Sequence, residues 1–127
     1  MTTAELRYLM ATIALHKELG GVKLTSIAER VGVSKVSVYR AVERLEKSGY
    51  VQRDEKNKVI VTPEGERLLE EYMVIVNFIS DHLEKHCGTP KDTAYQDALG
   101  AACALSDISR EGIAKTMAAI LQQASES

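Results

Sequence analysis

The sequence predicts a mainly α-helical protein, in which a winged helix-turn-helix domain (residues 1–63) precedes a helical dimerisation domain (residues 64–127). Apolar residues recur at helical spacing along most of the chain, and residues 25–62 follow the order helix, glycine turn, helix, hairpin. Residues 22–62 hold nine Lys/Arg against five Asp/Glu, whereas residues 63–127 hold five against eleven. A basic segment within an acidic chain is typical of a compact DNA-contacting module.

The composition excludes several protein classes. With 127 residues, 45% hydrophobic and 27% charged, the chain is expected to fold around a real core. It has no apolar run of 18 residues, and its first residues lack the layout of a signal peptide, so neither a membrane span nor secretion is expected. Two cysteines make no disulfide framework, which favours a cytoplasmic location. The absence of Trp argues against a stacking platform for single strands.

The N-terminal third predicts two helices. Residues 3–19 form the first, which the glycine pair at 20–21 ends. Thr25 is expected to cap a short helix over residues 26–31, and Gly32 to make the tight turn that follows. The apolar positions that indicate these helices are Leu6, Leu9, Met10, Ile13, Ile27, Ala28 and Val31.

A second capped helix and a hairpin complete the motif. Ser34 is expected to cap a helix over residues 35–47, and Gly49 to close it. The short β-prone runs 50–53 and 58–62 predict two strands, joined at a polar tip.

Three further helices are predicted. The first two, over residues 63–86 and 90–105, each begin at a Thr-Pro pair, since proline suits the first helical turn. The last begins at Ser106 or Ser109 and ends near Gln122, leaving a frayed polar tail.

The second helix of the motif is expected to place its N-terminal side chains in the major groove of DNA. Arg40 lies about one and a half turns into it, where arginine can pair with guanine. Arg53, at the end of the first strand, adds to the charge of the wing. The predicted DNA-binding residues are Thr25, Ser34, Lys35, Ser37, Tyr39, Arg40, Arg44, Lys56 and Lys58.

A protein-binding module and an enzyme are the alternatives to a DNA-binding function. A winged helix can bind a protein partner instead of DNA, with its charges merely solvated. An enzyme is not expected, because the sequence has no nucleophile–base pairing, no glycine-rich phosphate loop and no cysteine pairs at zinc spacing. The acidic pairs at 70–71 and at 92 and 97 are interpreted as solvated helix faces.

The string LTSIAERVGVSKVSVYRAVERLEKSGYV at 24–51 resembles the metal-dependent repressors of the diphtheria toxin repressor and manganese transport regulator family. The segment IVTPEG at 60–65, and the frames at 94–97 and 104–106, fit as well. The resemblance implies a short form: a homodimeric repressor of transcription that binds double-stranded DNA at an inverted-repeat operator. Winged-helix regulators of the multidrug-resistance type have a similar length and also dimerise through terminal helices, so that alternative family would hardly change the predicted fold.

The family's metal ligands do not carry over. Its members bind manganese or iron with carboxylates and imidazoles, which suit those metals. Neither group occurs at the matching positions, so no cofactor is expected there. These positions are Arg7, Met10, Val76 (or Asn77 if the register slips by one), Leu99, Ala102 and Cys103.

Two interpretations of these positions stay open. Their apolar side chains either fill the former site as core or line a small pocket for an organic effector, with Arg7 pairing an anionic group. A divalent metal would need other ligands, and His82, His86 and Cys87 offer such a set at helical spacing. The simpler view is a solvated helix end. Cys87 and Cys103 could form a redox switch only if they met each other or partner copies.

Overall fold

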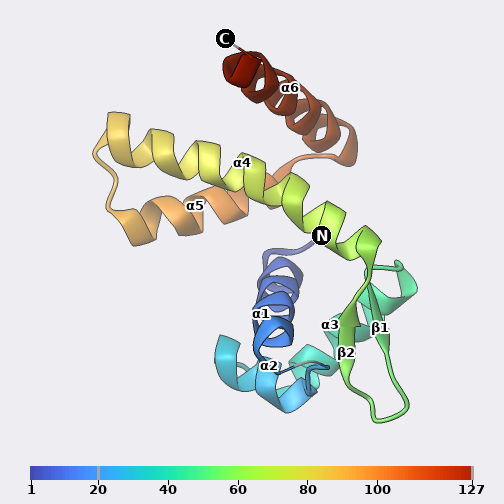
Figure 1. Cartoon of the computed structure of the whole chain (residues 1–127). Helices are drawn as coiled ribbons and strands as arrows, with labels where there is room; N and C mark the ends of the chain where they lie inside the picture. Colours follow the sequence, from blue (N-terminus) through green and yellow to red (C-terminus); the bar gives the residue numbers. More distant parts are fainter. Residues whose placement is uncertain (20, 127) are drawn as a thin grey trace. The chain divides into compact units, whose positions relative to one another are not determined.

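The structure is a computed structural model that describes residues 1–19 and 21–126, and it divides into two compact units, Met1–Leu69 and Glu70–Ser127. The division falls inside the long fourth helix. No helix in the described ranges is long and apolar enough to cross a membrane. The elements in Figure 1 are α1 (Thr3–Leu19), α2 (Leu24–Val31), α3 (Lys35–Lys47), β1 (Val51–Arg53), β2 (Val59–Val61), α4 (Pro63–Cys87), α5 (Lys91–Ala104) and α6 (Asp107–Glu126).

The first unit packs α1, α2, α3 and the hairpin around one core (Figure 1). Val38, Val42 and Leu45 lie on one face of α3 and are buried, together with Leu9 of α1 and Ile27 of α2. These positions follow the 3.6-residue helical period, so the opposite face of α3 points to solvent. The winged helix-turn-helix order that the sequence predicts is confirmed.

Glycine and serine fix the turn between α2 and α3 as predicted. Gly32 adopts a left-handed conformation (φ 80°), and the N–H groups of Gly32 and Val33 both donate to the carbonyl of Ala28. Ser34 then caps α3, because its Oγ accepts from the N–H of Ser37 at 3.2 Å. The predicted bounds of α3 are confirmed. The predicted role of Gly20 in ending α1 lies outside the described residues.

The prediction that Thr25 caps α2 is wrong. The helix begins at Leu24, with Lys23 in the cap position and no side-chain hydrogen bond to it. The reason is tertiary: Val22 forms an antiparallel bridge with Val59 of β2, through N–H to carbonyl bonds of 3.1 and 2.7 Å. The chain is therefore extended up to this bridge, and the helix starts directly after it.

The wing is a short antiparallel hairpin in which Val51 pairs with Val61 and Arg53 with Val59. Asp54 organises its tip, since its Oδ1 accepts from the backbone N–H of Lys56 at 2.8 Å and of Lys58 at 2.9 Å.

The start of α4 is tied to the hairpin. Thr62 caps the helix by accepting from the N–H of Gly65 at 3.1 Å, and its hydroxyl donates to the carbonyl of Gly49 at 2.6 Å. Gly65 is buried against Tyr50, and a Cβ at this position would overlap the Tyr50 carbonyl and press on Val61. The predicted Thr-Pro start is thus confirmed, and the first turns of α4 belong to the first unit.

The second unit consists of the rest of α4 with α5 and α6. Gly88 (φ 68°) reverses the chain, and α5 runs back along α4 (Figure 1). Tyr72 of α4 is buried in this unit, and burial raises the pKa of its hydroxyl. The buried aliphatic residues of this unit are Ile75, Val76, Ala94, Ala98, Leu99 and Ala102. Tyr72, Ser80 and Arg110 are buried beside them.

A buried arginine holds α6 to α4. Arg110 is the one buried residue of α6 in the described part of the chain, and its guanidinium donates to Glu71 at 3.0 Å, Tyr72 Oη at 3.2 Å and Asp107 at 2.7 Å. The hydrogen bond from Arg110 lowers the pKa of Asp107. Ser106 caps the helix, and α6 continues to Glu126 rather than ending near Gln122 as predicted, because its last turns hold no helix breaker.

Substituting Gly65 by alanine is expected to destabilise the first unit. The new methyl group has to displace the Tyr50 carbonyl, so the free energy of unfolding should fall by about 1–3 kcal/mol in urea titrations. Gly100→Ala in α5 is the matched control: its Cβ meets open space, and the change should raise stability by about 0.5–1 kcal/mol. A Gly65→Ala protein as stable as the parent would contradict the close approach.

Candidate nucleic-acid interface

The outward face of α3 is the most exposed part of the helix-turn-helix. Lys35, Val36, Ser37, Tyr39 and Arg40 are all exposed in its first two turns, because the buried residues of α3 lie on the opposite face. Sequence analysis missed Val36, whose side chain is 60% exposed. Its apolar character offered no signal, since an apolar residue is by default assigned to the core.

Two of the predicted contact residues serve the helix start. The hydroxyls of Ser34 and Ser37 lie 2.9 Å apart, and Ser34 also accepts from the Ser37 N–H. Both side chains remain exposed. They hold the first turn of α3 in place and leave Lys35 projecting from it.

Arg44 is held by the protein. Its Nε donates to Glu5 of α1 at 2.8 Å, which ties the last turn of α3 to the first turn of α1. The Arg44 side chain is still 57% exposed. Because Glu5 neutralises part of its charge, Arg44 is less available to a phosphate than an unpaired arginine. Helical spacing alone did not predict this ion pair.

Arg53 is likewise engaged. Its guanidinium donates to Glu46 at 2.9 Å and lies 5.3 Å from the centre of the Tyr39 ring. The hydrogen bond from Arg53 lowers the pKa of Glu46 and keeps this carboxylate charged. Arg53 thus links β1 to α3, whereas Arg40 has no ion-pair partner among the described residues.

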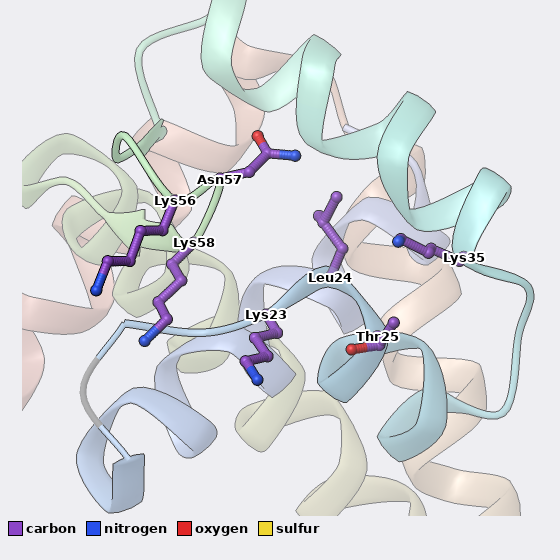
Figure 2. A pocket seen from close by; sticks show the side chains of 7 residues that line it. All are labelled: Lys23, Leu24, Thr25, Lys35, Lys56, Asn57 and Lys58. Atoms are coloured by element: carbon purple, nitrogen blue, oxygen red, sulfur yellow. The ribbon is translucent and has the colours of Figure 1, made fainter.

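A hollow of about 420 Å³ lies between the wing and the starts of α2 and α3 (Figure 2). We call it the lysine hollow. Thr25, Lys35, Lys56 and Lys58, four residues that the sequence predicted for DNA contact, come together here. Its lining consists of Lys23, Leu24, Thr25, Lys35, Lys56, Asn57 and Lys58. Lys23 was not predicted, because a bridge of one residue pair leaves no pattern in the sequence.

The positions that match the family's metal ligands divide between the two units. Arg7 is exposed and Met10 partly buried in the first unit. In the second, Val76, Leu99 and Ala102 are at most 1% exposed, which favours the interpretation that they fill the core. Neither carboxylate nor imidazole is present in this set, so its donor chemistry does not fit manganese or iron.

His82 and His86 lie on the exposed side of α4, with their ring centres 4.9 Å apart. Cys87 follows them and is exposed too. In the part of the chain that the structure describes, no three His, Cys, Asp or Glu residues gather as a possible metal site. The three residues therefore do not form the predicted alternative site within one chain.

Residues 11–64 match the family described as sugar-specific transcriptional regulator TrmB. The transcriptional regulator MntR of Salmonella typhimurium is 33% identical over 66 residues, which cover 49% of this chain and 42% of MntR. The match thus spans less than half of that relative. The TrmB family and MntR are both described as transcriptional regulators, and neither is described as an enzyme.

Solved structures share the fold over most of the chain. A hypothetical protein from Sulfolobus solfataricus aligns with a TM-score of 0.73 and 21% identity, over 97% of this chain and 91% of its own. The manganese regulator SloR aligns with a TM-score of 0.73 and 23% identity, over 92% of this chain and 54% of SloR. The resemblance to metal-dependent transcriptional regulators that the sequence predicted is thereby confirmed.

Proposed function

We propose that this protein is a DNA-binding transcriptional regulator that acts as a cytoplasmic repressor. The observation that supports this most is the exposed face of α3, which presents Lys35 and Arg40; Lys35 shares the lysine hollow with Lys56 and Lys58 of the wing. An α-helix of this kind fits the major groove, and the wing then lies along the adjacent backbone. The similarity to MntR and to TrmB-type regulators supports the same class.

Arg40 is the residue we assign to base recognition. It is exposed and has no ion-pair partner among the described residues, so its guanidinium is available for two hydrogen bonds to guanine. Val36, one helical turn before it, is placed to contact a thymine methyl group. Arg44 and Arg53, which are tied to Glu5 and Glu46, are better suited to supporting α3.

We infer that the protein works as a homodimer on an inverted repeat. The support comes from α6, which leaves most of its apolar side chains in water although it is 20 residues long. Ile113, Met117, Ile120 and Leu121 recur at helical spacing, and the last two are 59% and 63% exposed. A stripe of this kind gains stability when a second copy covers it.

We further propose that the family's metal response is lost. The matching positions offer no oxygen or imidazole ligand, so DNA binding is either constitutive or controlled by another signal. The pocket for an organic effector stays a prediction. Within the second unit, Val76, Leu99 and Ala102 are already packed as core.

Replacing Arg40 by alanine is expected to weaken operator binding by about 1–3 kcal/mol and to relax sequence preference at one position in each half-site. Titration of the DNA upstream of the protein's own gene by fluorescence anisotropy measures this. Arg67→Ala is the matched control, since Arg67 is exposed on α4 and pairs only with Glu64. If Arg40→Ala binds like the parent, α3 is not the recognition helix. If the parent itself shows no salt-dependent DNA binding, the winged helix binds a protein partner instead.

DNA affinity is expected to be the same for protein as purified, with chelator, and with added manganese, iron or zinc. The physical reason is the missing ligand set at the family positions. The same anisotropy titration, run in parallel with metal analysis of the protein, tests it. Binding that requires metal would overturn the proposal, and His82, His86 and Cys87 would then be the first ligands to mutate.

Leu121→Glu is expected to shift the dimer toward monomer in sedimentation equilibrium, because a carboxylate in an apolar interface loses its hydration. Lys115→Gln changes the net charge equally and lies on the opposite side of α6, so it should leave the dimer intact. An unchanged dimer in Leu121→Glu would place the interface elsewhere.

A further inference from the structure

Four lysines surround the lysine hollow, and its lining holds no acidic residue. None of the four has an ion-pair partner among the described residues. Figure 2 shows that they come from three separate segments: Lys56 and Lys58 from the wing, Lys23 from the entry to α2 and Lys35 from the start of α3. Like charges that gather without a counter-charge repel one another, and a bound anion relieves that repulsion.

Backbone contacts hold each lysine in place. The bridge between Val22 and Val59 brings Lys23 next to Lys58, and the Asp54 carboxylate fixes the backbone of Lys56 and Lys58 at the tip. The Ser34 cap fixes the first turn of α3, where Lys35 lies. The positions are therefore built into the fold, while the flexible lysine stems can turn toward an anion.

The start of α2 adds neutral donors to the same hollow. The first helical bonds of α2 are those from Ser26 and Ile27 to the carbonyl of Lys23, so the N–H groups of Leu24 and Thr25 precede them. Thr25 lines the hollow and is exposed. Its hydroxyl, which does not cap the helix, can donate into the same space.

The neighbouring hollow on the wing has a different character. It is lined by Arg53, Lys56 and Lys58, but also by Asp54 and Glu55, so its positive charges are largely balanced. Lys56 and Lys58 line both hollows, and the lysine hollow is the one of the two whose lining holds no acidic residue. It is therefore the better suited of the two to an anion.

We propose that the lysine hollow binds one phosphoryl group, supplied by the DNA backbone where the strand passes from α3 to the wing. A phosphate diester carries one negative charge and accepts several hydrogen bonds, which matches ammonium groups with hydroxyl and amide donors. This inference rests on the proposed function for the source of the phosphate. It assigns Lys23 and Thr25, together with the wing lysines, to setting the register of α3 on DNA.

The test combines protein variants with duplexes that carry a single neutral methylphosphonate. The binding site is first located by footprinting on the DNA upstream of the protein's own gene. In duplexes of that site, neutralising one particular phosphate in each half-site should lower the DNA affinity about tenfold. In the Lys23→Gln/Lys58→Gln protein, neutralising that same phosphate should cause no further loss of affinity. Neutralising any other phosphate should lower the affinity as much as it does for the parent. The salt slope of this variant should fall by about two units. The control, Lys91→Gln/Lys115→Gln, should behave like the parent.

If the affinity loss of the double variant simply adds to the loss from each neutralised phosphate, the assignment is overturned. The proposed function would still stand in that case. A second arm covers the case in which the parent binds no DNA. Amide chemical shifts of Leu24, Thr25 and Lys35 in the full chain are followed with sodium phosphate against sodium chloride at equal ionic strength. Saturable shifts, absent in the double variant, would identify free phosphate compounds as the source. No saturable shift and no DNA coupling would reject the site altogether.

Discussion

The two hydrogen bonds between Val22 and Val59 fix the path of the chain in the first unit. They join the segment that enters α2 to the second strand of the wing. As a result, the start of α2 is set at Leu24, and Lys23 lies beside Lys58. Without this bridge the lysine hollow would lose the contact that places Lys23 beside Lys58.

Ion pairs then decide which positive charges remain available. Glu5 engages Arg44, and Glu46 with Tyr39 engages Arg53, so both arginines support the position of α3. Exposed ion pairs contribute little to stability, but they orient long side chains. Arg40 and the lysines of the hollow have no such partner among the described residues. These cations thus divide into two arginines that are engaged in ion pairs and a set that has no ion-pair partner among the described residues.

Local sequence signals predicted the helices well. The Ser34 cap, the left-handed Gly32 and the Thr62 cap are each determined by residues a few positions apart, so the sequence contains all the information they need. The Thr25 cap failed for the opposite reason, since a partner 37 positions from Val22 along the chain sets the start of α2. The predicted end of α6 near Gln122 is too early, because the Gln and Glu residues of the tail favour helix although they are polar.

By itself, the sequence determined the fold class, the order of the elements and the exposed face of α3. These follow from periodicity, capping and side-chain type, which act locally. Only the tertiary structure decided that Gly65 must lie against Tyr50, that Arg44 and Arg53 are engaged, and that Lys23 joins three other lysines. Such contacts join residues distant in sequence, and they depend on how closely the backbones of separate elements approach.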